Sequence, residues 1–138
     1  MAKHPDHVGL FTILAIRKDR ALQGTVLQRI KEKKEILCLA HHPYHMGMEY
    51  MYHRETRVFF VIPNIHGVTL TELLAKNNGR LEEGAVKYIA AQLALAIGDL
   101  HDKGIIYRGL TTDSVVIDSV LGSIQIGDIE HSRKLGQD

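Results

Sequence analysis

The sequence predicts an α+β fold, in which antiparallel strands with one helix are followed by a mainly helical part. Three observations predict it: β-branched apolar runs of strand length, two stretches with helical spacing of apolar residues, and turn residues between these elements. The chain has 138 residues, of which 45% are hydrophobic and 24% charged, values typical of one globular domain with a modest core. No internal repeat or low-complexity tract interrupts the sequence.

The first third of the chain predicts a strand and a helix. Residues 8–16 are almost all apolar or β-branched, which favours a buried strand. From Leu22 the apolar residues follow helical spacing, and Lys33 occupies one position of the resulting stripe. The helix ends at His42-Pro43, because the residue before a proline avoids helical geometry. The single cysteine, Cys38, has apolar neighbours and is expected in the core.

The next segments predict a hairpin and a short helix. Strands are expected over residues 47–53 and 57–63, with the polar corner 54–56 between them. The second strand is apolar through most of its length, so we expect it to lie centrally in its sheet. Residues 69–72 read Thr-Leu-Thr-Glu, the pattern of a capping box that begins a helix, and Asn-Asn-Gly at 77–79 ends that helix.

A long helix is predicted from about Glu82 to Lys103, with Gly104 as its left-handed cap. Its expected inward stripe consists of Val86, Ala90, Leu93, Ile97 and Leu100. Other faces are also apolar, so this helix needs packing partners on more than one side. Two short strands, 115–118 and 123–127, are expected after it.

Charge and cysteine content argue against some classes of partner. Lys plus Arg number 17 and Asp plus Glu 16, so the formal net charge is +1, which gives no reason to expect nucleic acid or an anionic membrane. One cysteine cannot form an internal disulfide, which suits a reducing compartment. Residues 1–7 show no signal-peptide pattern and no apolar run has membrane-spanning length, so we expect a soluble cytoplasmic protein.

Residues 100–108, Leu-His-Asp-Lys-Gly-Ile-Ile-Tyr-Arg, closely resemble the approach to the catalytic loop in serine/threonine protein kinases of the AGC group, which includes the cyclic-nucleotide-dependent kinases. The order of predicted elements agrees with that family over residues 8–135. The resemblance implies a single truncated kinase-like domain over 1–138, with a partial small lobe at about 8–62, a hinge at 63–67 and the start of the large lobe at 68–138. The glycine-rich loop, which would precede residue 8, is expected to be missing.

The resemblance also implies that the residues needed for phosphate transfer are replaced. Leu14 stands at the position of the strand lysine that holds the phosphates, and Lys33 stands at that of the helix acid which pairs with it. In the catalytic loop, Gly109 replaces the aspartate, Thr111 the lysine and Ser114 the metal-binding asparagine. Losing a positioned general base alone costs ~10²- to 10⁴-fold in rate. We therefore expect a pseudokinase-like chain that is not an enzyme.

Cofactor and metal positions follow from the same resemblance. Asp128 matches the metal-binding aspartate, and it either binds a cation weakly or caps a turn. The candidate adenine-side positions are Ile62, Asn64, Ile65 and Val116. Without a phosphate grip, we expect no bound cofactor and little affinity for ATP with magnesium. Arg108 is expected to pair with Asp128, Glu130 or a backbone carbonyl.

Two functions remain open at this point. The favoured one is a non-catalytic binding or scaffolding subunit of a larger assembly, held through the long helix at 82–103. Its partner, another protein or the remainder of a parent chain, is expected to cover a face marked by Ile89, Ala91, Ala94, Leu95 and Gly98. The alternative is a part of a serine/threonine kinase, or an ATP sensor, that another chain or a longer parent protein completes.

Overall fold

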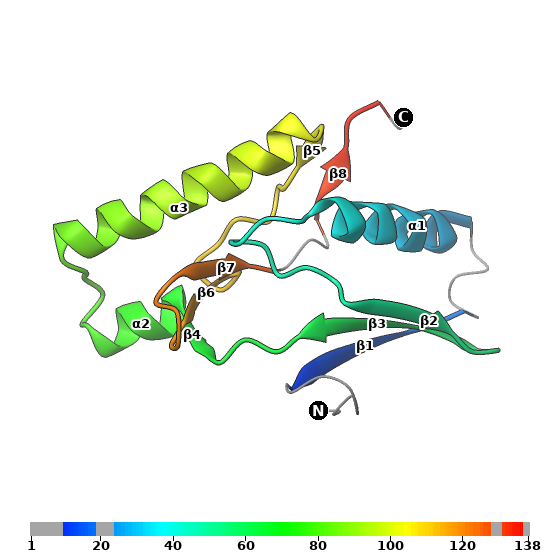
Figure 1. The fold of residues 1–138 in the computed structure, drawn as a ribbon, viewed down its shortest axis with the longest axis horizontal. Helices are drawn as coiled ribbons and strands as arrows, with labels where there is room; N and C mark the ends of the chain where they lie inside the picture. The colour runs from blue at the N-terminus through cyan, green and yellow to red at the C-terminus, as the bar shows by residue number, and fades with distance from the viewer. Residues whose placement is uncertain (1–9, 19–23, 128–130, 137–138) are drawn as a thin grey trace.

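The computed structural model describes residues 10–18, 24–127 and 131–136 (Figure 1). In chain order the elements are β1 (Phe11–Arg17), α1 (Gly24–Leu39), β2 (Tyr50–His53), β3 (Arg57–Pro63), β4 (Gly67–Thr69), α2 (Leu70–Lys76), α3 (Glu83–Asp102), β5 (Ile105–Ile106), β6 (Val115–Asp118), β7 (Ile124–Ile126) and β8 (Arg133–Lys134). Figure 1 shows α1 over the sheet of β1, β2 and β3 at one end, and α2 and α3 beside the strands at the other. The α+β fold expected from the sequence is confirmed.

The first sheet has the strand order β1-β3-β2, so the strand predicted to be central is central. All its pairs are antiparallel, with Leu14 opposite Phe60 and Phe60 opposite Met51. These side chains belong to the face that forms the hydrophobic core. On the other face Ile13 is 39% exposed. The prediction of a buried strand over 8–16 is therefore wrong for most of its described part, because β1 beyond the buried Phe11 is covered on one face only.

Helix α1 meets the core through Ile30, Ile36 and Leu37, and Ala40, the residue after the helix, is buried with them. Cys38 is exposed, so its predicted place in the core is wrong. The reason is helical geometry, because each residue turns the chain by about 100°. The residue after Leu37 therefore points away from the sheet, and the side facing the core returns at Ala40.

The second sheet has the order β4-β6-β7, and a separate pair is formed by β5 and β8. In that pair Ile105 lies opposite Lys134 and Ile106 opposite Arg133. The amide of Leu135 continues the pairing by donating to the carbonyl of Gly104 at 2.7 Å. This pairing places the segment after residue 130 directly beside the chain that leads into residues 107–114.

The predicted start and end of the short helix α2 are confirmed in detail. Thr69 accepts from the amide of Glu72, and the Glu72 carboxylate accepts from the amide of Thr69 at 2.9 Å, which completes the capping box. After the helix, Asn78 and Gly79 have φ of 54° and 75°. Glycine reaches such left-handed backbone at little cost, which is why the helix ends there.

Helix α3 begins and ends within one residue of its predicted bounds, and Gly104 follows it with φ of 70°. Its buried residues are Gln92, Ala96 and Leu100. The predicted inward stripe is wrong in its first two members, because Val86 and Ala90 are exposed. Figure 1 shows the first turns of α3 reaching past the strands of the second sheet, so contact with the core begins at Ile89. None of the described helices is both long and apolar enough to cross a membrane.

Candidate functional site

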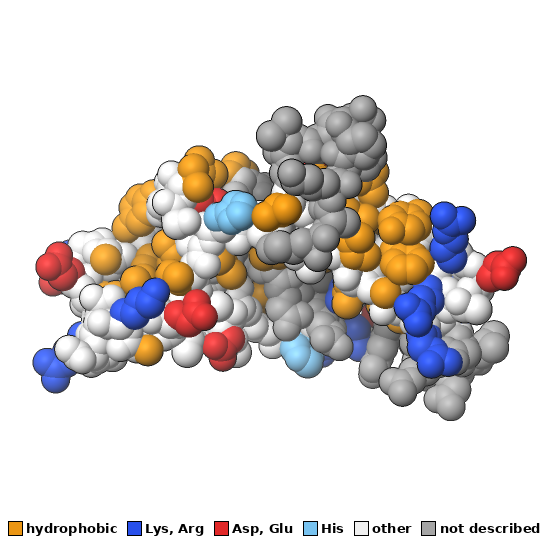
Figure 2. Space-filling view, turned by 90° about the horizontal axis from the view of Figure 1, so that it is seen from below, with side chains coloured by type: hydrophobic (Ala, Val, Ile, Leu, Met, Phe, Trp, Pro, Cys, Tyr) orange, Lys and Arg blue, Asp and Glu red, His pale blue; other side chains and the backbone are white. Residues whose placement is uncertain are grey.

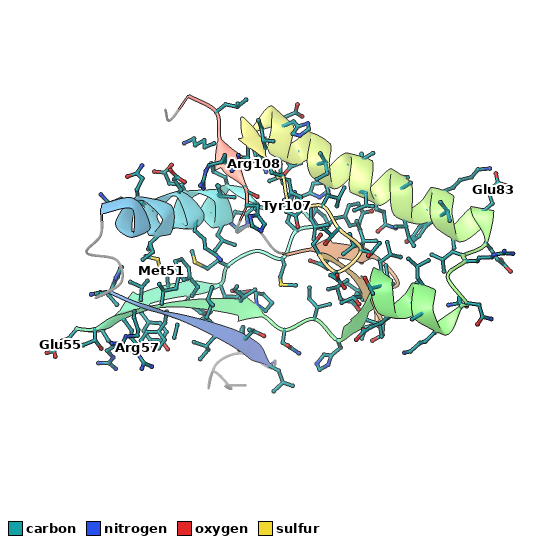
Figure 3. All side chains as sticks on the ribbon, turned by 180° about the vertical axis from the view of Figure 1, so that it is seen from behind. Met51, Glu55, Arg57, Glu83, Tyr107 and Arg108 are labelled. Atoms are coloured by element: carbon teal, nitrogen blue, oxygen red, sulfur yellow. The ribbon has the colours of Figure 1, made fainter. Side chains whose placement is uncertain are left out.

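The candidate site is the loop at 107–114, which leaves β5 between α1 and α3. Figure 3 shows Tyr107 and Arg108 there. Arg108 has φ of 54°, a backbone conformation that is unusual for a residue with a side chain. Its Nε donates to the carbonyl of His131 at 2.8 Å, and the Ser132 hydroxyl donates to the carbonyl of Tyr107 at 3.0 Å. Of the partners expected for Arg108, a backbone carbonyl is therefore the one observed, while Asp128 and Glu130 lie outside the described residues.

The second half of the loop is held by a turn between Thr111 and Ser114. The Ser114 hydroxyl accepts from the amide of Thr111 at 2.9 Å and donates to the carbonyl of Thr111 at 2.9 Å. The Thr111 hydroxyl in turn accepts from the amide of Ser114 at 3.2 Å. Both side chains thus close the turn on itself. Asp113 is exposed, and Gly109 brings no side chain to the loop.

The start of α2 supports the same loop. The Thr71 hydroxyl donates to the Thr112 hydroxyl at 2.7 Å, and the amide of Thr71 donates to the carbonyl of Thr112 at 3.2 Å. Because the capping box holds the first turn of α2, these bonds transfer its rigidity to the loop. The loop is therefore anchored at both ends, to residues 131–132 and to α2.

Leu14 lies on the inner face of β1, and Lys33 is partly exposed on α1. Their match to the lysine and the acid of the family stays a prediction. The acids beside Lys33 have cationic partners that the sequence did not reveal. Glu32 accepts from Arg133 at 3.0 Å, and Glu35 accepts from Lys134 at 3.3 Å. Residues about 100 positions apart leave no local signal of such a pairing. These contacts tie α1 to β8, and through β8 to the chain that enters the loop.

The predicted adenine-side residues are only partly brought together. Asn64 accepts from the Thr12 hydroxyl at 3.3 Å, and Ile62 lies opposite Thr12 in the first sheet. Val116 belongs to the second sheet, opposite Thr69. A cavity of about 300 Å³ lies on one side of the hinge. Asn64 and Ile65 line it, together with Met46, Asp118 and Gln125, while Ile62 and Val116 do not.

The metal candidate Asp128 lies outside the described residues. Among the residues that are described, no three His, Cys, Asp or Glu side chains are grouped so that they could hold a metal ion.

Most of the α3 residues predicted to meet a partner are exposed or partly exposed, and their role in binding stays a prediction. Ala91 and Ala94 are exposed, Leu95 is 59% exposed and Gly98 is partly exposed. Ile89 does not belong to this face, because it packs against the core cluster. The face is therefore narrower than the sequence suggested.

A model of the protein kinase domain family matches residues 2–138. The chain is 30% identical over 126 residues to Protein kinase 2 of Dictyostelium discoideum, which is 91% of this chain and 26% of that protein. It is 34% identical over 110 residues to Protein kinase C eta type of Homo sapiens, 79% of this chain and 16% of the relative. It is 30% identical over 137 residues to Ribosomal protein S6 kinase 2 beta of Xenopus laevis, 94% of this chain and 21% of the relative.

The chain spans about a quarter or less of the length of these curated relatives. All three are named protein kinases, and this finding contradicts the expectation that the chain is not an enzyme. Replacement of single residues in motifs is therefore not sufficient ground for placing it outside the enzymes. The match over nearly all its residues shows that the chain belongs to the protein kinase domain family and resembles the AGC group within it.

Proposed function

We propose that this chain is a section of a serine/threonine protein kinase domain that functions when a second polypeptide segment, from its own parent chain or from another protein, packs on α3. The observation that carries the proposal is the exposed apolar stripe on that helix. Tyr88, Ala91 and Leu95 follow each other at helical spacing, and Tyr88 and Leu95 are 56% and 59% exposed. Neighbours three and four positions apart share a helix face, so the three form one surface.

The stripe faces away from the residues that α3 contributes to the core. Gln92, Ala96 and Leu100 are buried, and they are rotated from the centre of the stripe by roughly 70°, 110° and 150° respectively. Ala91 and Gly98 are small, so the axis of a second helix could approach α3 to the 8–10 Å typical of helix pairs. The chemistry of this surface suits an apolar helical segment more than a charged ligand.

Packing on α3 would bear directly on the candidate site. The helix ends at Asp102, Gly104 turns the chain, and β5 leads into the loop at 107–114. A segment that immobilises α3 would therefore also restrain the loop through β5. The ion pairs of α1 with β8 restrain the same loop through the strand that pairs with β5. This arrangement supports a binding-dependent module, with phosphate transfer as an activity of the completed assembly.

The experiment compares three forms of the full chain, expressed with a tag in cells of its natural host. Leu95→Arg places a long charged side chain on the stripe, and Val86→Arg places the same side chain at an exposed position rotated by roughly 170° around α3 from the stripe. We expect the unaltered chain and Val86→Arg to purify with a polypeptide that carries the remaining helical part of a kinase domain. Leu95→Arg should lose that polypeptide while its circular dichroism stays unchanged.

Phosphate transfer from radiolabelled ATP to a serine peptide is then measured on the purified assemblies. Transfer that is present with the unaltered chain and Val86→Arg, and lost with Leu95→Arg, supports the kinase role. Association without transfer supports the binding role alone. If the unaltered chain purifies as a folded monomer, or if Leu95→Arg associates as well as Val86→Arg does, the proposal is wrong.

A further inference from the structure

His45 is a buried histidine. It lies where α1 and the first sheet, on one side, meet α3 on the other. It lies in the loop that connects α1 to β2, and the side chain is only 3% exposed. Its Nε2 is 3.4 Å from Oδ2 of Asp99 on α3. Despite this short distance, Nε2 has no hydrogen-bond partner among the described residues. A buried polar atom without a hydrogen-bond partner costs folding free energy. A change in the protonation of this ring therefore changes the stability of the residues packed around it.

The loop around His45 holds the two parts of the molecule together. The amide of Met46 donates to the carbonyl of Ile126 at 2.9 Å, and the amide of Ile126 donates to the carbonyl of Tyr44 at 2.9 Å. The Gln125 side chain adds a bond to the carbonyl of Pro43 at 2.8 Å. Figure 1 shows this loop passing beside β7 before the chain enters β2. We call residues 43–46 the anchor segment.

Three titratable groups face His45 from the elements around it. His42, in the same loop, has its ring 5.4 Å from that of His45. From α3 comes Asp99 and from the residue that caps its end Lys103, and the two form an ion pair with each other at 2.7 Å. From β7 the neighbour is Ile126, which carries no charge.

These surroundings make the charged form of His45 unfavourable in the folded chain. Burial lowers the pKa of His45 most. Asp99 and a hydrogen bond with the backbone of Ala96 oppose this effect, while His42 and Lys103 lower the pKa further. Burial also tends to raise the pKa of Asp99, but the ammonium of Lys103 with the two histidines brings it below its ordinary value. Asp99 is therefore ionised near neutral pH and already committed to Lys103.

We propose that His45 makes the anchor segment sensitive to acid: when its ring takes up a proton, the segment separates from α3 and β7 more readily. The closed form, with its lowered pKa, binds the proton less readily than an open form in which the ring meets water. The closed form is thus fully favoured above the ordinary pKa of 6.5 and loses stability as pH falls below it. The loss ends once pH passes the lower pKa of the closed form.

The first test is amide hydrogen exchange of the full chain, followed by NMR from about pH 7.5 to about pH 5.5. The amides of Met46 and Ile126 report opening of the anchor segment, after correction for the intrinsic effect of pH on exchange. Uptake of one proton allows the opening constant to rise by up to about tenfold per pH unit below 6.5. His45→Leu and His45→Gln should show no such rise, whereas His101→Gln, an exposed position on α3, should keep it.

The second test uses the ring signals of His45 to follow its pKa in two variants. Asp99→Asn removes the charge that favours the imidazolium, so the pKa of His45 should fall further. Lys103→Gln removes a charge that disfavours it, so that pKa should rise. The opposite signs separate a specific electrostatic role from general loosening of the helix end.

Two results would overturn the proposal. One is constant corrected exchange of Met46 and Ile126 in the unaltered chain across this pH range. The other is a rise that persists unchanged in both His45→Leu and His45→Gln. Neither result would contradict the proposed role of α3 in binding a second segment, because that role depends on the stripe of Tyr88, Ala91 and Leu95.

Discussion

The ion pairs between α1 and β8 lead to a prediction of their coupling energies, which depend on how exposed the charged side chains are. The Glu32 side chain is 13% exposed and that of Arg133 is 39% exposed. The second pair, Glu35 with Lys134, is more open, at 47% and 34%. A third pair, Glu83 with Lys87 on α3, is almost fully exposed, at 80% and 75%, and serves as the control.

The expected coupling energies are ordered by exposure. Exposed ion pairs contribute about 0.2–1 kcal/mol, because water screens the charges and ordering of the side chains costs entropy. We expect the Glu32–Arg133 pair near the upper end, at about 1 kcal/mol, and the Glu35–Lys134 pair near the middle. The control pair on α3, four residues apart, should give about 0.3–0.5 kcal/mol.

The assay is a double-mutant cycle for each pair, with unfolding in urea followed by circular dichroism. For the first pair the cycle comprises Glu32→Ala, Arg133→Ala and the double variant. The cycle is needed because Arg133 also makes a long bond of 3.5 Å to the carbonyl of Ser132, and the single substitution removes that as well. Repeating the cycles as salt rises from about 0.1 M to about 1 M should reduce the control coupling more than that of the first pair, since partly buried pairs are less screened.

Two outcomes would refute this reasoning. If the Glu32–Arg133 coupling is zero, α1 is not tied to β8 in solution. If all three pairs give the same coupling and the same salt dependence, exposure does not set their strength in this chain.

Three further predictions concern the hinge, the short helix and the nucleotide. A Cβ at Gly67 would lie 2.2 Å from the carbonyl oxygen of Ile117, so Gly67→Ala should destabilise the chain by ~1–3 kcal/mol or more in urea unfolding; a smaller change would mean that β4 shifts freely. Thr69→Ala removes the cap of α2 and should lower the free energy of unfolding by ~1 kcal/mol in the same measurement. An unchanged urea midpoint would show that the capping box does not stabilise the chain. A ligand at a hundred times its Kd stabilises a folded protein by about 2.7 kcal/mol. Millimolar ATP with magnesium should raise the melting temperature of this chain far less than that stabilisation would, and a large magnesium-dependent rise would contradict the prediction.

Local chemistry explains why much of the fold could be predicted from the sequence. The bounds of β3, the capping box at Thr69 and the end of α3 before Gly104 all depend on residues within a few positions of each other. Their hydrogen bonds and backbone preferences act over one turn or one strand, so neighbouring residues are enough to specify them. The motif at residues 100–108, with which the order of these elements agrees, identified the kinase resemblance that the family model confirms.

The sequence by itself determined the class of fold and the order and most bounds of the helices and longer strands, but not the short strands β4, β5 and β8. Only the tertiary structure decided which sides of those elements are covered, as Cys38 and Val86 show by their exposure. It also decided which charges meet, since Glu32 and Arg133 are separated by about 100 residues in the chain. Helical spacing fixes which residues share a face, but the direction of that face depends on how distant elements pack, and packing energies between distant segments leave no periodic signal in the sequence.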